Sequence, residues 1–482
     1  MDNLPVVAVV GTTGVGKSNL AIEIALALDG EVVNADSMQV YKGLDVITNK
    51  VTLEERNLAV HHLLDFIDPI EEDDYSVLKF ERDALRVIAD IHSRGKVPIL
   101  VGGTHYYIQS VLWDSNLVSS SDQAKELDEQ QSETDEAHSS LPPELALEIG
   151  QCLANSSISF KPSQTSEHDP IVEQLGRLLA RVDPIMATRW HPKDWRKIRR
   201  SLQVYYTKGE RHSDILNRQK EEGGGALRFR TCVFWLWAEN KALDLRLDNR
   251  VDAMIKNGLF DEINDMRQRV REANGGKVEI DYTRGIMQTI GFKEFDAYLN
   301  MLEGRHDPKE VESLRKQSVE SMQAATRRYA RRQVTWIKNK LGPKCLEEAK
   351  KAGMQSHVTF YALDATDLSN WKSSVRDEGV QLCRNFIAGT QETEPTTLTV
   401  KLLGLESTVS TSNQTRQTDW VARTCDICVD AKTGEPKLVH GAREWEIHIK
   451  SNAHAKSVKR AKWKAEFKQW EENNKRQKTD TD

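Results

Sequence analysis

The sequence predicts an α/β fold in which a parallel β-sheet forms the core, and three observations support this prediction. Apolar runs at Val6–Val10, Glu31–Asn34 and Val97–Val101 have the length and composition of buried strands. Residues 19–28 and 80–94 lie between these runs and show the spacing of amphipathic helices. Strands that alternate with helices pack as a parallel sheet with crossover helices. Polar or glycine-rich segments follow each run, which places a ligand site at the carboxyl ends of the strands.

The first predicted strand leads directly into a phosphate-binding motif. Its eight residues fit the pattern G-x-x-x-x-G-K-[ST]: Gly11, Thr12, Thr13, Gly14, Val15, Gly16, Lys17 and Ser18. Glycines let consecutive backbone N–H groups point at a phosphate oxygen, and the following helix adds its partial positive charge. We expect all eight residues to bind a diphosphate, with Lys17 as a point charge and Ser18 as a ligand for Mg²⁺. The fold class is therefore P-loop NTPase-like, unless this segment is a glycine-rich turn without a ligand.

Composition and charge exclude several classes of protein. The 482 residues carry a net charge of −6, so the chain as a whole is not a strongly basic nucleic-acid binder, although local patches can still be basic. Six scattered cysteines do not form the dense pattern of a disulfide scaffold. We expect no membrane span, because no apolar run approaches the required length. The N-terminus lacks a signal peptide or an Arg-rich presequence, so we expect a cytoplasmic protein, with mitochondria or the nucleus as further compartments.

Changes in composition divide the chain into a core, an insertion and a C-terminal unit. The predicted ranges are 1–113 and 226–345 for the core, 114–225 for a mostly helical insertion with a disordered acidic part, 346–420 for a linker or extension of unknown role, 421–470 for a Lys-rich unit, and 471–482 for a disordered tail.

The later part of the core repeats the same alternation. A strand at Thr231–Trp237 precedes long helical segments at residues 243–274 and 311–340. Within the extension, Val358–Leu363 and Leu398–Leu403 have the composition of short strands.

A carboxylate follows the second predicted strand. P-loop kinases and ATPases usually place an Asp at the end of a neighbouring strand to hold Mg²⁺. Here the run Val97–Val101 ends in Gly102, Gly103 and Thr104, which offers a hydroxyl in place of the carboxylate. Asp36 could hold Mg²⁺ through water or accept a proton from a nucleophile. The alternative is that Asp36 only caps a helix beginning at Ser37.

Five segments together resemble the tRNA dimethylallyltransferase (tRNA isopentenyltransferase) family, in its eukaryotic form with a C-terminal zinc finger. They are Gly11–Ser18, Asp36–Gly43, Val101–Tyr107, Ile290–Phe295 and Ala325–Ile337. The resemblance covers roughly residues 4–345 apart from the acidic insert. It implies transfer of a dimethylallyl group from its diphosphate to N6 of the adenine 3′ of the tRNA anticodon, with release of diphosphate.

The resemblance also assigns roles to four residues of the core. Lys17, together with Mg²⁺, would stabilise the charge that develops on the departing diphosphate. Asp36 would be the base that deprotonates the weakly nucleophilic amine. Thr104 matches a threonine near the bridging oxygen, and Arg246 matches an arginine that grips the diphosphate.

Simpler structural roles remain open for two of these residues. Thr104 could cap the helix that begins at His105. Arg246 could be a solvated helix charge paired with Asp248 or Asp252.

Contacts with tRNA are expected at two kinds of site. The adenine must leave the base stack, and the family suggests that groups near Ser37 read its edge. Basic residues, some on a predicted helix at 193–209, would hold phosphates, unless they form only a solvated face. The tRNA-binding candidates are Ser37, Met38, Gln39, Tyr41, Lys197, Arg199, Arg200, Arg284, Arg327 and Arg328.

The C-terminal unit carries a metal-binding pattern. Cys425 and Cys428 form a C-x₂-C pair, and His448 and His454 follow as H-x₅-H on a predicted helix at 445–464. This combination fits a structural C2H2-type Zn²⁺ site, with His440 as a competing ligand. The alternative is two unrelated pairs that never meet.

The sequence leaves rival functions open. An isopentenyltransferase acting on free AMP, ADP or ATP would have a similar core but would need neither an insertion nor a finger. A small-molecule kinase would need the missing strand-end Asp. An inactive RNA-binding protein would not need Lys17, Ser18, Asp36 and Thr104 together. We expect a monomer whose partners are the tRNA anticodon stem-loop and dimethylallyl diphosphate.

Overall fold

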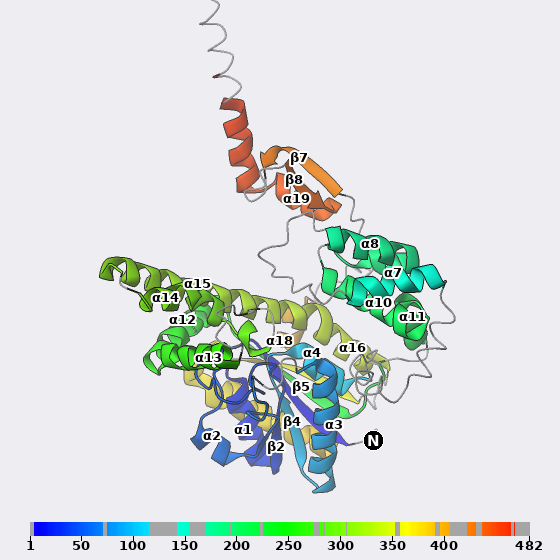
Figure 1. The fold of residues 1–482 in the computed structure, drawn as a ribbon. Helices are drawn as coiled ribbons and strands as arrows, with labels where there is room; N and C mark the ends of the chain where they lie inside the picture. The colour runs from blue at the N-terminus through cyan, green and yellow to red at the C-terminus, as the bar shows by residue number, and fades with distance from the viewer. Residues whose placement is uncertain are drawn as a thin grey trace, which may run out of the picture. The chain divides into compact units, whose positions relative to one another are not determined.

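The computed structural model describes most of the chain and separates into two units (Figure 1). The first unit comprises Met1–Leu117 and Gly223–Val409, and the second comprises Val118–Glu222 and Ser410–Asp482. The described residues are 4–70, 75–114, 142–154, 170–192, 194–221, 225–273, 280, 282, 285–304, 306–351, 357–390, 396–404, 422–429, 436–463 and 467.

The core of the first unit is a six-stranded parallel sheet. Its strands are β1 (Pro5–Gly11), β2 (Gly30–Asn34), β3 (His61–His62), β4 (Val97–Val101), β5 (Arg230–Trp237) and β6 (Val358–Asp364). Their order is β3-β2-β4-β1-β5-β6, so β1 lies near the centre, with Val9 opposite Val101 on one side and Phe234 on the other. The predicted parallel α/β core is confirmed.

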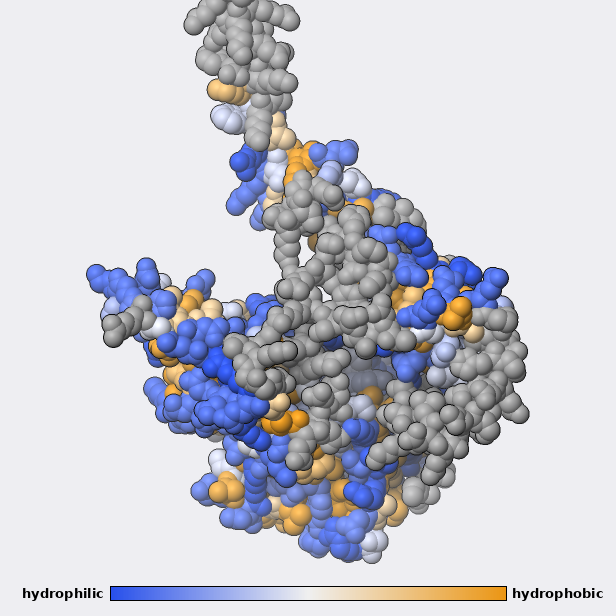
Figure 2. Space-filling view, viewed as in Figure 1, coloured by the Kyte–Doolittle hydropathy of each residue, from blue (hydrophilic) through white to orange (hydrophobic). Residues whose placement is uncertain are grey.

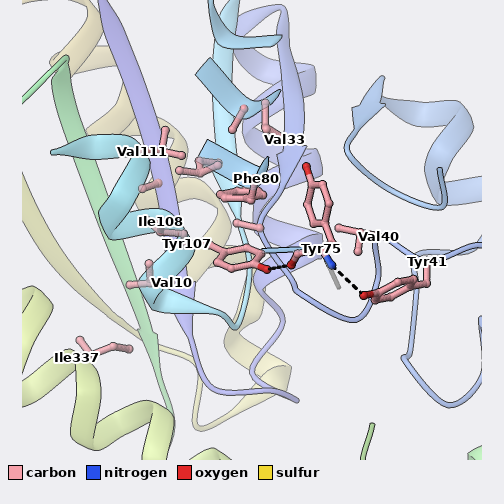
Figure 3. Close-up of a cluster of buried hydrophobic side chains, with 14 of the residues drawn as sticks. Val10, Val33, Val40, Tyr41, Tyr75, Phe80, Tyr107, Ile108, Val111 and Ile337 are labelled. Atoms are coloured by element: carbon pink, nitrogen blue, oxygen red, sulfur yellow. Dashed lines mark hydrogen bonds between the residues drawn. The ribbon is translucent and has the colours of Figure 1, made fainter. Parts of the chain in front are cut away.

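Both faces of the sheet are buried, which explains why the strands read as continuous apolar runs. Alternate residues of β1 belong to two hydrophobic clusters, with Val10 in one and Val9 in the other. Figure 3 shows the first cluster, where Phe80 and Tyr107 stack with ring centroids 4.3 Å apart.

Helices of the first unit cover these faces and extend beyond them. They are α1 (Lys17–Leu28), α2 (Leu53–Leu58), α3 (Val77–Ser93), α4 (His105–Leu112), α12 (Asn240–Lys256), α13 (Leu259–Ala273), α14 (Phe292–Leu302), α15 (Pro308–Trp336), α16 (Gly342–Lys351), α17 (Glu378–Ala388) and α18 (Thr397–Leu403). On the face shown in Figure 2, hydrophilic residues predominate over α12, α13 and α15. The predicted helix at 243–274 is interrupted because Gly258 adopts a φ of +91°, which separates α12 from α13.

The segment predicted as a linker belongs largely to the core, so the boundary at residue 345 is corrected. β6 pairs with β5 from Val358 to Asp364, and β6 is the edge strand of the sheet. Leu398–Leu403, expected as a strand, lies in helix α18, because Thr396 caps its first turn and Gly404 ends it in the left-handed conformation.

The helical part of the second unit packs around its own apolar cluster. The helices are α7 (Pro143–Ala154), α8 (Pro170–Val182), α9 (Pro184–Arg189), α10 (Trp195–Lys208) and α11 (His212–Glu221). Leu178 and Leu202 are among the side chains buried between them. The mostly helical character of the insertion agrees with expectation. Much of its acidic part, at residues 115–141 and 155–169, lies outside the described residues, as does the tail at 471–482.

The C-terminal part of the second unit is a ββα arrangement. β7 (Ala422–Val429) and β8 (Pro436–His440) are antiparallel, and α19 (Ala442–Ile449) follows them. The helix predicted at 445–464 is interrupted at residues 450–451 and resumes at 452–463. No helix among the described residues is long and apolar enough to cross a membrane.

The position of β6 generates a prediction about where the chain can be shortened. A chain ending at residue 345 would uncover β5 and lose the buried side chains of Phe360 and Phe386, so we expect no cooperative thermal transition. A chain ending at residue 409 keeps the whole first unit and should unfold cooperatively. Circular dichroism during heating would compare the two, and a stable, soluble 1–345 chain would contradict the assignment of β6 to the core.

Candidate active site

A cavity of about 420 Å³ lies at the carboxyl ends of β1, β2 and β4. Its walls come from several parts of the first unit: the phosphate loop, the turn after β2, the loop at residues 47–51, the Gly102–Gly103 turn, residues 288–290, and helices α12 and α15. The convergence of these segments is what a parallel sheet with crossover helices predicts for a ligand site.

The phosphate loop adopts the curled conformation that its glycines permit. Gly14 and Gly16 have φ values of +82° and +95°. A Cβ atom on Gly16 would lie 2.6 Å from the indole of Trp371, and one on Gly14 would lie 2.7 Å from a methyl group of Leu247. Side chains at these positions would therefore be strained and would collide with the packing behind the loop.

Lys17 is held inside the loop. Its Nζ donates a hydrogen bond to the Thr12 carbonyl at 2.8 Å, and the side chain lines the cavity. Burial lowers the pKa of Lys17 to about 8, Asp36 opposes this shift, and Arg250 adds to it. The charged form of Lys17 is therefore available to an anion near neutral pH and is lost as the pH rises above 8.

Asp36 faces the cavity at the end of β2. Its Oδ1 accepts a hydrogen bond from the Met38 N–H at 2.9 Å, which fixes the carboxylate in a local turn. Residues 37–40 form a turn and not a helix, so Asp36 does not cap a helix there. Oδ2 of the same carboxylate lies 3.5 Å from where a Cβ atom on Gly103 would be. The carboxylate thus lies between two strand-end turns.

Thr104 and Ser37 connect these two turns. The Ser37 N–H donates to Thr104 Oγ1 at 3.1 Å, and the Thr104 hydroxyl donates to Ser37 Oγ at 3.2 Å. Thr104 occupies the position before α4, but its side chain makes no capping hydrogen bond to that helix. Its hydroxyl therefore contacts Ser37, which lines the cavity, whereas Thr104 is not itself among the lining residues.

The structure places Arg246 away from the cavity wall and Arg250 in it. Arg246 donates to the Ala365 carbonyl at 2.8 Å and to the carbonyl of Thr366, just after β6. Arg250, one turn further along α12, lines the cavity and donates to Thr13 Oγ1 at 2.8 Å. Arg246 thus binds these two carbonyls and does not form the predicted ion pair with Asp248 or Asp252. Asp248 instead pairs with Arg327.

Sequence reasoning missed several residues that the structure brings to the site. Gln333 and Tyr329 line the cavity from α15, and burial followed by the nearby charge of Asp36 raises the pKa of the Tyr329 phenol. His105 lies behind the loop, within 3.3 Å of the Gly11 N–H, and burial followed by the charge of Lys17 lowers its pKa to about 3. Gln333 and Tyr329 stood within a motif that supported the resemblance, but no spacing rule pointed to their roles.

The wall formed by residues 47–51 is anchored from α13. Both oxygens of Glu262 accept backbone hydrogen bonds, from the Val46 N–H at 2.8 Å and the Ile47 N–H at 2.7 Å. Gln39 holds the same loop from the other side, since its Nε2 donates to the carbonyls of Thr48 and Asn49 at 3.0 and 3.1 Å. Both contacts use Nε2 of Gln39, and its side-chain oxygen takes part in neither.

Among the residues expected to read the adenine, Ser37, Met38 and Gln39 line the cavity. Tyr41 does not, because it is 2% exposed and its hydroxyl accepts a hydrogen bond from the Tyr75 N–H at 3.3 Å (Figure 3). Tyr41 packs in the apolar core beneath the site.

The basic candidates differ in how accessible they are. In the second unit, Lys197 is exposed beside Asp194, whereas Arg199 donates to the Leu153 carbonyl at 2.9 Å and Arg200 is half-buried, which lowers its pKa. In the first unit, Arg327 pairs with Asp248 and Arg328 is exposed on α15. Arg284 lies outside the described residues.

The C-terminal Cys and His residues do meet. The ligand atoms of Cys425, Cys428, His448 and His454 all lie within 4.8 Å of one another. His448 Nε2 is buried without a recorded hydrogen-bond partner among the described residues. Two thiols and two imidazoles at this spacing suit a tetrahedral metal ion, and His440, at the end of β8, is outside the group of four.

Comparisons with known proteins agree with this geometry. The family model described as IPP transferase matches residues 39–340. The chain is 37% identical over 465 residues to the tRNA dimethylallyltransferase of Schizosaccharomyces pombe, covering 96% of both proteins. It is 36% identical to the Homo sapiens protein of the same name, covering 95% of this chain and 86% of that protein.

A solved structure shows the same fold. Crystal structures of a eukaryotic dimethylallyltransferase acting on tRNA superpose on the chain with a TM-score of 0.69 at 33% identity, covering 97% of this chain and all of the other. The resemblance inferred from the sequence motifs is thus confirmed, and the chain belongs to the IPP transferase family, alongside the tRNA dimethylallyltransferases.

Proposed function

We propose that this protein transfers a dimethylallyl group from dimethylallyl diphosphate to N6 of the adenine 3′ of the anticodon in tRNA, releasing diphosphate. The observation that carries the proposal is the convergence of Asp36 with the phosphate loop in one cavity, where β4 ends in glycines in place of a carboxylate. The names of the relatives support the same reaction.

The phosphate loop would bind the leaving group. Residues at the start of α1, including Lys17, and the side chain of Arg250 line the cavity, and we propose that backbone N–H groups there join the two cations in binding the diphosphate. These groups are held in place before the reaction, so they stabilise the charge on the departing oxygen without reorganising. Arg250 suits this role better than Arg246, whose donors are occupied by backbone carbonyls.

The residues present fit a magnesium ion. The hydroxyl of Ser18 lines the cavity and is the kind of hard oxygen donor that Mg²⁺ prefers. Asp36 would meet the ion only through water, which leaves its carboxylate oxygens for the proton. When bound, the ion would neutralise charge on the diphosphate.

The nucleophile would be the exocyclic amine of an adenine that has left the base stack. Its lone pair is delocalised into the purine, so removal of a proton as the C–N bond forms lowers the barrier. Asp36, which lines the cavity, would accept that proton. The C–N bond would form as the bond from the allylic carbon to the diphosphate oxygen breaks; diphosphate departs, and the amine proton is transferred to the Asp36 carboxylate.

The apolar part of the cavity would hold the prenyl group and exclude water. Ile47, Val251, Met254, Ile290 and Met322 line it. A dry site protects an allylic carbon that water would otherwise attack, and it strengthens the electrostatic contacts with the diphosphate.

Recognition of tRNA would use charges outside the cavity. Lys197 and Arg328 are exposed, and exposed lysines lie on the helical residues 452–463 of the C-terminal unit. Such residues would contact phosphates and position the anticodon stem-loop.

We propose Zn²⁺ as the ion held by Cys425, Cys428, His448 and His454. Its role would be structural, because the protein supplies all four ligands.

We further propose that the protein acts as a monomer in the cytoplasm. None of the six cysteines is in a disulfide, as in a reducing compartment. A transferase that modifies free AMP, ADP or ATP is the second candidate function, since such an enzyme would need the same phosphate loop to bind the diphosphate.

The first prediction from the proposed function concerns the reaction and its base. Incubated with labelled dimethylallyl diphosphate, the protein should label total tRNA and leave AMP unlabelled. Asp36→Asn keeps the acceptor for the Met38 N–H but cannot take a proton, so we expect turnover to fall by about 10²–10⁴-fold with little change in affinity for the prenyl diphosphate.

Asp90→Asn is the matched control, because Asp90 is an exposed carboxylate on α3 paired with Arg94. Its turnover should stay near that of the unaltered protein. Labelled AMP would favour the second candidate function, and full turnover in Asp36→Asn would remove Asp36 as the base.

The second prediction concerns pH. Lys17 in the free protein loses its charge above pH 8, so affinity for inorganic pyrophosphate should fall by about 10-fold as the pH rises through that value. Isothermal titration calorimetry would measure it. Lys17→Met should bind weakly at every pH, and this variant also corrects for the ionisation of pyrophosphate itself. A decline of equal size in Lys17→Met would show that Lys17 is not its source.

The third prediction concerns the metal. Elemental analysis should find about one zinc per chain, and a chelator should unfold residues 422–463 without unfolding the first unit. Limited proteolysis would locate the new cleavage sites, and calorimetry would follow the first unit. Cys425→Ser should reproduce the effect without chelator. Unfolding of the first unit by the chelator would contradict a local structural role.

A further inference from the structure

One carboxamide connects two loops that are distant in the sequence. Gln333 Oε1 accepts a hydrogen bond from the Thr13 N–H of the phosphate loop at 2.8 Å. Gln333 Nε2 donates to the Gly103 carbonyl, at the end of β4, at 3.0 Å. The glutamine is separated from these partners by 320 and 230 residues, so α15 crosses the site and joins the two loops.

The fit around this carboxamide is tight. Gln333 is 4% exposed, and both of its polar atoms have partners. A Cβ atom on Gly103 would lie only 2.5 Å from Gln333 Nε2, so any larger residue at position 103 would collide with the amide. The other nearest atoms would be at ordinary contact distances, with Asp36 Oδ2 at 3.5 Å and the Tyr329 hydroxyl at 3.6 Å.

The two loops carry different parts of the proposed reaction. The phosphate loop holds the diphosphate, while the Gly102–Thr104 turn carries Thr104, which binds Ser37 beside Asp36. The distance between leaving group and base therefore depends on how the two loops are spaced. Between Thr13 and Gly103, Gln333 sets that spacing through hydrogen bonds at both ends of its amide.

We propose that Gln333 is a positioning residue that fixes the phosphate loop against the Gly102–Thr104 turn, so that the diphosphate and Asp36 are aligned for transfer. This inference rests on the proposed function. The Thr13 N–H donates to Gln333, so this N–H is not one of the backbone groups that would bind the diphosphate. Gln333 then acts through the two loops and not on the substrate.

This role has a distinct kinetic signature. Without the carboxamide, the phosphate loop and Lys17 still bind the diphosphate, so KM for the prenyl diphosphate should change little. The reacting groups lose their alignment, and a displacement of about 1 Å can cost 10²-fold in rate. We therefore expect Gln333→Ala to lower kcat by about 10- to 100-fold, with KM within about 3-fold.

Gly103 provides a second, independent way to break the same contact. In Gly103→Ala the new methyl group displaces the amide, so kcat should fall by a similar factor. In the double variant Gly103→Ala/Gln333→Ala the amide is absent and the methyl group meets no atom closer than 3.5 Å. The double variant should therefore be no slower than either single variant, whereas independent defects would multiply.

Two further variants separate hydrogen bonding from packing. Gln333→Met fills a similar volume without donor or acceptor and should be as slow as Gln333→Ala. Gln323→Ala removes another glutamine of α15, whose amide contacts Asp252 at 3.5 Å, and should leave kcat unchanged. Thermal unfolding and pyrophosphate titration would confirm that each variant is folded and binds the leaving group.

The outcomes separate this inference from the proposed function. An unaltered protein that labels no tRNA would refute the function, whatever Gln333 does. An active protein whose Gln333→Ala variant keeps its kcat, or whose Gln333→Met variant regains it, would refute the positioning role. Multiplying losses in the double variant would also refute it, because the two residues would then act separately.

Discussion

The curled backbone from Gly11 to Ser18 is the constraint on which the rest of the structure depends. The loop needs left-handed glycines and close neighbours, and these neighbours come from three distant segments. Leu247 of α12 packs against Gly14, the indole of Trp371 packs against Gly16, and Gln333 of α15 binds the Thr13 N–H. A short motif is thus held by contacts from much of the first unit, which keeps its N–H groups directed before a ligand arrives.

This arrangement gives a physical reason for the segment after residue 345. β6 extends the sheet beside β5, and Arg246 binds the carbonyls where β6 ends. Trp371 follows, and its Nε1 donates to Glu23 of α1 at 3.2 Å. The segment thus packs against the phosphate loop and α1, which gives it a structural role close to the site.

The site combines an anchored loop with charged side chains in a partly buried cavity. Glu262 fixes the loop at residues 46–47, and burial raises the pKa of its carboxyl group even though two backbone N–H groups favour its charged form. Lys17 shifts in the opposite direction for the same reason, since burial disfavours a charge of either sign. Placing cations and a carboxylate around one cavity offsets part of this cost and prepares the site for an anionic leaving group.

Local sequence predicted five of the strands in the described sheet, all but β3, and the grouping of Cys425, Cys428, His448 and His454, because each depends on periodicity or fixed spacing between near neighbours. It failed where the outcome depends on distant packing. Leu398–Leu403 has strand-like composition but is helical, and a seemingly separate linker contains the edge strand β6.

The same distinction applies to individual site residues. Arg246 and Arg250 lie one helical turn apart, and only the packing of α12 decides which of them enters the cavity. Tyr41 is adjacent in sequence to residues of the site but points into the core. The sequence by itself determined which groups are available for the proposed chemistry, since the glycine-rich loop and the carboxylate after β2 both lie in short segments. Tertiary structure decided which side chains align that chemistry, because contacts such as that of Gln333 with Thr13 and Gly103 join residues hundreds of positions apart.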